Sequence, residues 1–223
     1  MRAGIAAIPD GSYRFEDVLD DDGLKERNVK FALEVRKAGE RIVFDFTGSS
    51  PQVPGNVNLT LNALQSSVCY ALKAMLDPDL PNNQAAIDAV EIIAPAGTVA
   101  NCLPPAAVAL RANTRQRVID VVIGALADVL PYRRSGLLTE QTPAWCLPAS
   151  TCAAAHPMST SKPSAAVWAA ATTAMARDGV QVHITNTSNL PVEAIEMEYP
   201  LRVEEYALVT DSGARAVFVA AWG

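Results

Sequence analysis

The sequence predicts an α+β fold, and two kinds of pattern support this prediction. Short stretches alternate apolar and polar side chains, which is typical of strands. Longer stretches repeat apolar side chains at a spacing of three to four residues, which is typical of amphipathic helices. Strands and helices do not alternate strictly along the chain, so the pattern favours α+β over a doubly wound α/β fold.

The first half of the chain contains one strand and one helix with clear patterns. The predicted strand at 41–47 places three apolar side chains on one face. A loop follows at 48–58, because this stretch contains two prolines and two glycines. The predicted helix at 59–76 carries an apolar stripe and ends where 77–83 brings prolines and Asx turns.

Two short strands are predicted next, at 89–93 and 106–110. A second helix is predicted to begin at Asn113 or Thr114, since both residue types are suitable N-caps, and to continue to Leu130. The proline that follows cannot continue a helix and therefore stops it.

The C-terminal region is predicted to contain strands again, at 179–186 and 192–209. Pro191 has no N–H, so we expect it to mark the start or edge of a strand. An extended segment would place Glu193 and Glu196 on opposite faces. We expect Glu193 to be the inward one, because it lies closer to the preceding polar turn.

The composition excludes several classes of protein. The 223 residues are 50% hydrophobic and 19% charged, so a core can form and global disorder is excluded. A net charge of −6 argues against nucleic-acid binding, which requires clustered positive charge. No apolar run is long enough to cross a membrane, and the N-terminus lacks the pattern of a signal peptide. Four cysteines without a CxxC spacing suit a reducing compartment, so we expect a cytoplasmic protein.

One segment differs in composition from the rest of the chain. Residues 135–176 contain twelve alanines but only one acidic and one basic residue. They also contain two of the three tryptophans, although tryptophan is usually buried. We therefore divide the chain into residues 1–133, the anomalous segment 134–177 and residues 178–223.

Several stretches together resemble the hydantoinase B/oxoprolinase family. They occur in the family order and with family-like spacing, and five together are far more specific than any one alone. The resemblance covers residues 1 to about 133 and about 178 to 213. The stretches are IPDGSYRFEDVLDDDG (8–23), VFDFTGSSPQVPGNVN (43–58), DPDLPNNQ (77–84), NTRQRVIDVVIGALADVLP (113–131) and HITNTSNLPVEAIEMEYPLRVEEYAL (183–208).

The resemblance implies an ATP-dependent enzyme that opens cyclic amides such as hydantoins and 5-oxoproline. Similar proteins include caprolactam hydrolases and acetone or acetophenone carboxylases. A hydantoinase A-type partner would bind ATP with Mg, and a small cyclic amide would be the substrate, with neither nucleic acid nor membrane as a partner. The family's proposed divalent-metal motifs belong to an N-terminal portion that this sequence lacks. The chain therefore resembles the C-terminal part of a longer subunit, and we assign no metal site to it.

Two segments, 134–177 and 213–223, depart from the family pattern. Shifting plausible GC-rich codons by one base, in one direction, restores family-like glycine-rich sequence in both. We therefore hypothesise a frameshifted gene or an assembly error. Residues out of frame carry no selected burial pattern, so we expect 135–176 to pack poorly and Trp145 and Trp168 to be more exposed than core tryptophans.

No catalytic residue is assigned from the sequence, but four residues are candidates for contacting a substrate or a partner. Asp45 follows a predicted strand, where its carboxylate either faces the substrate region or, with the nearby threonine, holds the following turn. Asn186, Asn189 and Glu193 belong to the polar turn TNTSNLPVE, which either orients a ligand or is held by its own side-chain hydrogen bonds.

Two further pairs of polar residues have alternative interpretations. Asn56 and Asn58 either donate amides to a substrate or cap the helix that follows. Arg115 and Gln116 lie near the start of the second helix, where backbone N–H groups favour an anion, or they are solvated helix-end residues.

Three functional hypotheses follow from the sequence. The chain is a fragment of an ATP-dependent cyclic-amide hydrolase subunit, of the N-methylhydantoinase or 5-oxoprolinase type. Alternatively, it belongs to a subunit of the acetone or acetophenone carboxylase type, or it is a non-catalytic truncated product. We expect the fragment alone to be inactive. The substrate and the oligomeric state are not encoded in any motif of the chain.

Overall fold

The structure is a computed structural model that describes residues 1–81, 83–130, 183–184, 191–199 and 202–204. The chain divides into two units, Met1–Leu137 and Leu138–Gly223. The anomalous segment 134–177, with Trp145 and Trp168, lies outside the described residues, and so does 213–223. Their poor packing and the frameshift stay predictions.

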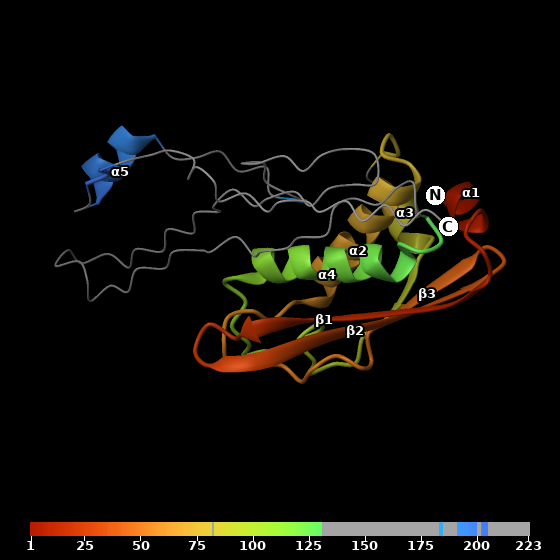
Figure 1. Cartoon of the computed structure of the whole chain (residues 1–223), viewed down its shortest axis with the longest axis horizontal. Helices are drawn as coiled ribbons and strands as arrows, with labels where there is room; N and C mark the ends of the chain where they lie inside the picture. Colours follow the sequence, from red (N-terminus) through yellow and green to blue (C-terminus); the bar gives the residue numbers. More distant parts are fainter. Residues whose placement is uncertain (82, 131–182, 185–190, 200–201, 205–223) are drawn as a thin grey trace, which may run out of the picture. The chain divides into compact units, whose positions relative to one another are not determined.

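The described part of the chain combines five helices with four strands, which confirms the α+β prediction (Figure 1). The strands are β1 (Gly11–Asp21), β2 (Glu26–Ala38), β3 (Arg41–Asp45) and β4 (Glu91–Ile93). The helices are α1 (Arg2–Ala6), α2 (Leu61–Leu76), α3 (Gln84–Asp88), α4 (Arg111–Leu126) and α5 (Val192–Glu198).

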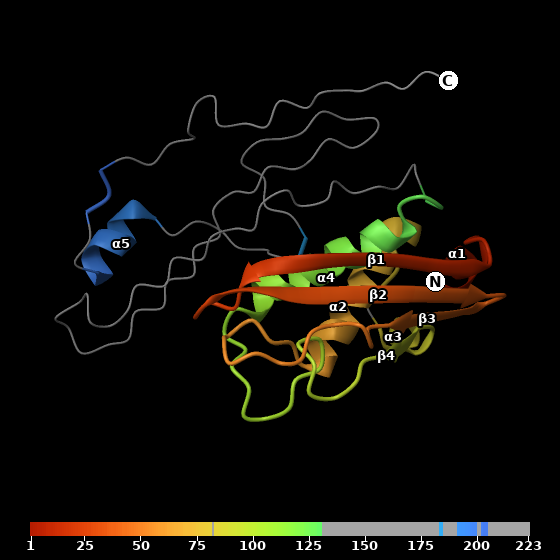
Figure 2. The same ribbon diagram turned by 60° about the horizontal axis from the view of Figure 1, so that its bottom comes forward.

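The four strands form one mixed sheet in the order β1-β2-β3-β4 (Figure 2). The first three strands are antiparallel neighbours, whereas β3 and β4 are parallel. Parallel neighbours need a long crossover connection, and α2 and α3 provide it between β3 and β4. Past the end of β3, Ser50 continues the pairing with β2, because its N–H donates to the Lys30 carbonyl at 2.9 Å.

The long β1–β2 hairpin is an element that was not predicted from the sequence. Val29, Phe31, Leu33 and Val35 are buried along β2, and the residues between them are more exposed. This alternation is the period of two that a half-buried strand requires. The signal was present in the sequence, but the many charged residues on the other face obscured it.

The helices α2 and α4 form a second layer, which packs against one face of the sheet (Figure 1). α4 packs against β1 and β2, and α2 packs beside α4. Gly124 allows this close packing, since a Cβ there would lie 2.8 Å from the ring of Phe15. The core between the layers consists of apolar side chains from both helices and the sheet, chiefly Phe31, Phe44, Leu64, Val68, Leu72, Val118, Val121 and Val122.

Most predicted elements in the first unit are confirmed. The strand at 41–47, the helix at 59–76 and the short strand at 89–93 correspond to β3, α2 and β4. The strand predicted at 106–110 is wrong, because this stretch is irregular and its backbone bonds to a neighbouring loop instead of a strand. The Ala107 carbonyl accepts from Asn58, and the Leu110 N–H donates to the Asn56 carbonyl.

The second helix is confirmed, but its predicted ends are not. α4 begins at Arg111 after the N-cap residue Leu110, which provides no side-chain cap. Thr114 therefore lies inside the helix, where its buried hydroxyl donates to the Val57 carbonyl at 2.7 Å. The helix ends at Leu126, four residues before the predicted end.

The strand predicted from residue 192 is wrong at its start, because Val192–Glu198 is the helix α5. Its sequence VEAIEME is rich in helix-forming residues, and Ile195 is buried. Pro191 is the N-cap residue of a helix and not the start of a strand. Among the helices that the structure describes, none is both long and apolar enough to span a membrane.

Candidate functional site

Asp45 lies at the end of β3 and belongs to a network of polar side chains on one face of the sheet. Its carboxylate accepts from the Arg36 guanidinium at 2.9 Å and from the Thr47 N–H at 3.0 Å. The Thr47 hydroxyl donates to the same carboxylate at 2.5 Å. These contacts hold the turn after β3, so the turn-holding role considered for Asp45 is present in the structure.

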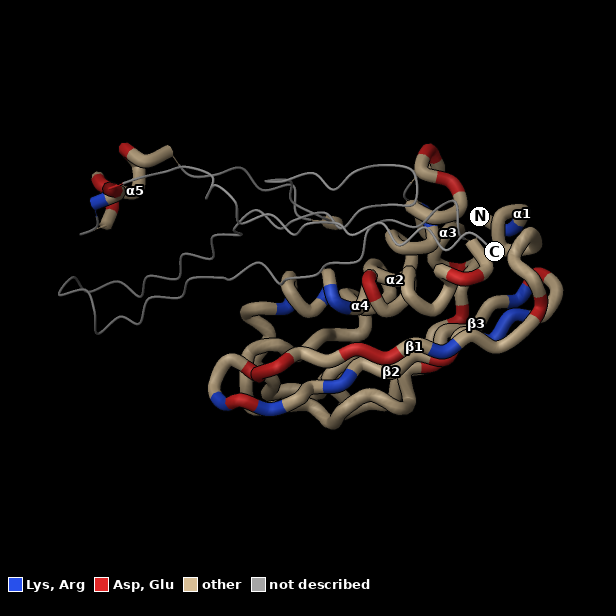
Figure 3. The backbone as a smooth tube through the Cα atoms, viewed as in Figure 1, with Lys and Arg blue, Asp and Glu red and all other residues tan. Residues whose placement is uncertain are grey.

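The network continues from Asp45 across three strands, and we call it the β-strip: Ser12, Arg14, Glu34, Arg36, Asp45 and Thr47. Glu34 is its centre, because it accepts from Ser12 at 2.8 Å, from Arg14 at 2.8 Å and from Arg36 at 3.3 Å. Pairing of β1 with β2 and of β2 with β3 places Glu34 opposite both Arg14 and Asp45. Figure 3 shows acidic and basic positions following one another along these strands.

The electrostatic surroundings keep Asp45 ionised. Burial alone would raise the pKa of this carboxyl, whose side chain is only 15% exposed. The hydrogen bonds from Thr47 and the charge of Arg36 outweigh burial, so the pKa lies below its usual value of 3.8. A carboxylate with a lowered pKa is a poor proton donor at neutral pH, so Asp45 suits charge pairing and positioning better than general acid catalysis.

The Asp45→Asn substitution is expected to lower the free energy of unfolding by about 1 kcal/mol at pH 7, because it removes the ion pair with Arg36. The folded-state pKa of Asp45 lies below the ordinary value of 3.8. Its stabilising contribution is therefore complete above that value and is lost as the pH falls through the folded pKa. Urea unfolding of both proteins should converge well below pH 3.8, and a constant difference down to acid pH would contradict this assignment.

The other charged members of the β-strip, Arg14, Glu34 and Arg36, were not found from the sequence. A signal existed, since charges of opposite sign lie two residues apart on one face, at Arg14 and Glu16 in β1 and at Glu34 and Arg36 in β2. These side chains come together only in the pairing register of β1 with β2, which places Arg14 opposite Glu34. That register could not be predicted, because the β1–β2 hairpin itself had not been predicted.

A second cluster forms where the loop at 51–58 meets the tip of the β1–β2 hairpin and the start of α4. Asn58 is fully buried there. Its amide donates to the carbonyls of Val53, Gly55 and Ala107 at 2.8, 2.9 and 2.9 Å, and its oxygen accepts from the Val53 N–H at 2.9 Å. Neither interpretation of Asn58 from the sequence is correct, because the amide is fully used within the fold and α2 has Thr60 as its N-cap residue.

Gly55 and Asp22 make the closest approach in this cluster. A Cβ on Gly55 would lie 1.6 Å from the backbone oxygen of Asp22. Asp22 itself is 1% exposed, and one of its carboxylate oxygens accepts from the N–H groups of Leu24 and Lys25. These backbone hydrogen bonds, that of Lys25 above all, lower the pKa of Asp22 despite its burial. The cluster therefore fixes the hairpin tip to the loop.

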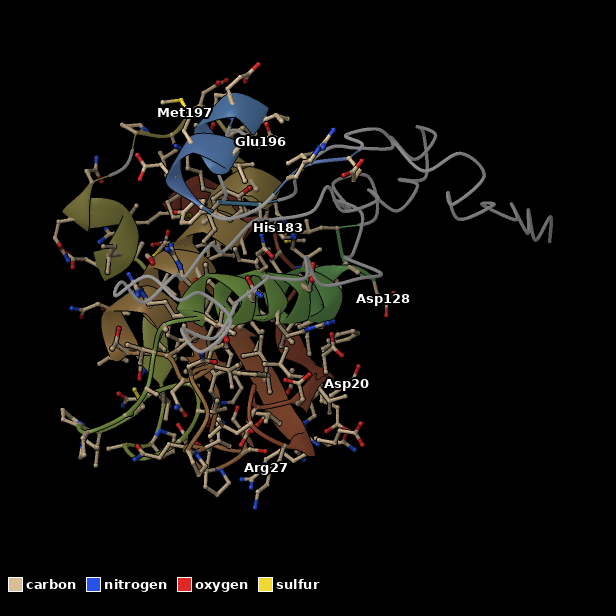
Figure 4. All side chains as sticks on the ribbon, turned by 90° about the vertical axis from the view of Figure 1, so that its left-hand side faces the viewer. Asp20, Arg27, Asp128, His183, Glu196 and Met197 are labelled. Atoms are coloured by element: carbon tan, nitrogen blue, oxygen red, sulfur yellow. The ribbon has the colours of Figure 1, made fainter. Side chains whose placement is uncertain are left out.

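The hairpin tip also carries a shallow depression of about 500 Å³, lined by Asp20, Asp21, Glu26, Arg27 and Asn28. Asp20 and Arg27 lie at this end of the hairpin in Figure 4. Arg27 reaches the buried Asp22 at 3.2 Å, so part of the local negative charge is neutralised. Within the described ranges, no three His, Cys, Asp or Glu side chains are arranged to hold a metal ion.

The remaining predicted site residues belong to the second unit. Asn186 and Asn189 lie outside the described residues. Glu193 lies in the first turn of α5 and is exposed, so the prediction of an inward strand position is wrong. Residues three apart are neighbours on a helix surface, so Glu193 and Glu196 lie on the same side of α5. The Glu196 carboxylate accepts from the Val203 N–H at 2.9 Å. The adjacent Met197 is 86% exposed (Figure 4).

Comparison with known proteins adds the family context. The model of the hydantoinase B/oxoprolinase family matches residues 1–218. The B-type subunit of a D-/L-hydantoinase from Pseudomonas sp. (strain NS671) is 31% identical over 227 aligned residues, which cover 96% of this chain and 38% of that protein. The chain thus spans less than half the length of this relative.

Two solved structures share the fold. The ATP-dependent caprolactamase of Pseudomonas jessenii superposes with a TM-score of 0.70 and 21% identity, covering 95% of this chain and 37% of its own. A nucleotide-free acetone carboxylase superposes with a TM-score of 0.53 and 18% identity, covering 63% of this chain and 20% of its own. At such identities the likeness concerns the fold alone.

Proposed function

Because the chain belongs to the hydantoinase B/oxoprolinase family, we propose that it forms part of a subunit of an ATP-dependent cyclic-amide hydrolase. The observation that carries the proposal is the family match over residues 1–218, which includes both units of the chain. The 31% identity to the B-type subunit of a D-/L-hydantoinase supports the same class of reaction, and the fold shared with the ATP-dependent caprolactamase is compatible with it. N-methylhydantoin and 5-oxoproline are the substrate types that we propose first.

The proposed reaction solves a problem of reactivity. A cyclic amide carbon is a poor electrophile, and transfer of a phosphoryl group from ATP to the amide oxygen turns that oxygen into a good leaving group. One water then adds to the carbon, and the ring C–N bond breaks as the nitrogen takes up a proton, which leaves an acyl phosphate. A second water hydrolyses the acyl phosphate to the carboxylate and phosphate, and both steps require a site sheltered from bulk water. We place ATP and Mg on a hydantoinase A-type partner. A divalent metal, if the enzyme uses one, would be held by a portion of the subunit outside this chain.

Within this scheme the first unit supplies structure and contact surface. The β-strip presents ionised side chains in fixed positions, and Asp45 serves to orient a partner or substrate group and not to transfer a proton. We also retain Asn186, Asn189 and Glu193 as proposed contacts with substrate or partner. The absence of a CxxC spacing among the cysteines supports our proposal of a cytoplasmic location.

The purified chain alone is expected to show no ATP-dependent hydrolysis of hydantoin or 5-oxoproline, even with Mg present. The reason is that the ATP site of the proposed enzyme belongs to a partner. Ring-opened product and ADP should be measured together, and the chain should co-purify with a hydantoinase A-type subunit. ATP-dependent turnover by the chain alone would contradict the proposal, and so would its failure to bind the ATP-binding subunit.

A carboxylase-type subunit is the second candidate, because acetone carboxylase shares the fold. Bicarbonate-dependent consumption of ATP with acetone or acetophenone, in place of a cyclic amide, would favour it. A non-catalytic truncated product is the third possibility, and sequencing the codons for 134–178 distinguishes it. A corrected reading frame supports either enzyme, whereas stop codons in the neighbouring frames support the truncated product.

A further inference from the structure

Two neighbouring arginines of α4 lack the acidic partner that most other described arginines have. Arg111 and Arg115 lie one helical turn apart, and neither makes an ion pair with a carboxylate among the described residues. By contrast, most of the other described arginines pair with acids, namely Arg14, Arg27, Arg36, Arg41, Arg117 and Arg202. In a chain of net charge −6, two neighbouring guanidiniums without a carboxylate are unexpected.

The orientation of Arg115 is fixed by α2. Its Nε donates to the Ser67 hydroxyl at 3.4 Å and its Nη2 donates to the Ser66 hydroxyl at 3.1 Å. Both serine hydroxyls donate in turn to the Ala63 carbonyl, at 3.0 and 2.8 Å. The serine oxygens therefore serve as acceptors for Arg115 and hold one edge of its guanidinium. Among the described residues, the Nη1 group at the other edge makes no hydrogen bond.

Arg111 extends the positive charge without neutralising it. Within the part of the chain that the structure describes, its side chain makes one hydrogen bond, from Nη1 to the Val108 carbonyl at 3.4 Å. Burial, and after it the neighbouring charge of Arg111, lowers the pKa of Arg115. Both effects disfavour the protonated guanidinium, so the arrangement costs free energy unless negative charge is supplied. Figure 3 shows basic positions along α4.

We propose that Arg111 and Arg115, where α4 packs beside α2, bind an oxyanion with at least two acceptor oxygens, a phosphate or a carboxylate. A guanidinium fork matches such a group in two parallel hydrogen bonds, which a spherical anion cannot accept. The site is independent of the proposed hydrolase reaction, because it depends only on the contacts of α2 and α4.

The test measures binding of inorganic phosphate and of acetate to the full chain at constant ionic strength, with chloride as the balancing anion. Phosphorus NMR titration and the thermal unfolding midpoint serve as readouts. We expect phosphate or acetate to raise the midpoint of the natural chain relative to chloride. The double variant Arg111→Gln/Arg115→Gln should weaken binding about tenfold or more, because charge-assisted hydrogen bonds are lost.

A matched control is Arg14→Gln/Arg41→Gln, which removes the same charge from arginines that already have acidic partners. It should bind the anion like the natural chain. Without anion, Arg111→Gln alone should leave the unfolding midpoint unchanged or raise it, since it relieves the repulsion of Arg115. Binding of phosphate alone or of acetate alone supports the proposal and identifies the preferred oxyanion. The proposal is overturned if neither anion binds, or if the double variant binds as tightly as the natural chain.

Discussion

The Asn58→Ala substitution is expected to lower the free energy of unfolding by about 3 kcal/mol or more. The variant leaves the carbonyls of Val53, Gly55 and Ala107 and the N–H of Val53 without their side-chain partner in a buried cluster. Each buried polar group that loses its partner costs about 1–3 kcal/mol. Urea unfolding followed by circular dichroism measures this difference. A domain stability of about 5–15 kcal/mol makes the loss easy to detect.

Asn101 provides the matched control for this substitution. Its amide donates to one carbonyl, that of Ala94 at 2.8 Å, so Asn101→Ala should cost only about 1 kcal/mol. The Asn58→Asp substitution tests the direction of a pH dependence. A carboxylate that faces three carbonyl oxygens destabilises the fold most when it is ionised. The deficit of this variant should shrink as the pH falls. Equal effects of the two alanine substitutions would refute the role assigned to Asn58.

The Gly55→Ala substitution is expected to cost roughly 3 kcal/mol or more and to loosen the hairpin tip from the loop at 51–58. The new Cβ would lie 1.6 Å from the backbone oxygen of Asp22 and 2.8 Å from its Cβ. Backbone atoms cannot rotate away as a flexible side chain does, so the hairpin must move. Hydrogen exchange at Leu24 and Lys25 should accelerate, because their N–H groups bond to Asp22.

Gly39→Ala separates this steric effect from the general cost of replacing glycine. Gly39 has φ +59°, and no atom lies within 4 Å of the position that a Cβ would take, so only backbone strain of about 1 kcal/mol is expected. If Gly55→Ala were as mild as Gly39→Ala, the close approach to Asp22 would not hold in solution.

The fold was predictable wherever one strong period dominated a stretch. The apolar stripe of α2 and the alternation of β3 depend on neighbouring residues alone, so the sequence was sufficient. α5 shows the limit of this approach, because VEAIEME fits a helix about as well as an alternating strand and a preceding proline is compatible with both.

The candidate site was less predictable, because its contacts join distant parts of the chain. Thr47 and Asp45 are two residues apart, and a turn held by both was among the interpretations from the sequence. Asn58 bonds to Ala107 from 49 residues away, and Arg117 pairs with Asp17 across 100 residues. No local pattern specifies such partners, which exist only once the sheet register and the helix packing are formed.

The most direct measurement of the proposed function uses a chimera. Residues 1–130 of this chain replace the matching residues of the B-type subunit of the Pseudomonas D-/L-hydantoinase, which is 31% identical, and the chimera is assembled with an ATP-binding partner subunit. Ring opening of hydantoin and formation of ADP are then followed together. We predict ring opening that requires ATP and that Gly55→Ala abolishes or strongly weakens. A chimera that folds and binds the partner, yet opens no ring in the presence of ATP, would contradict the proposed function.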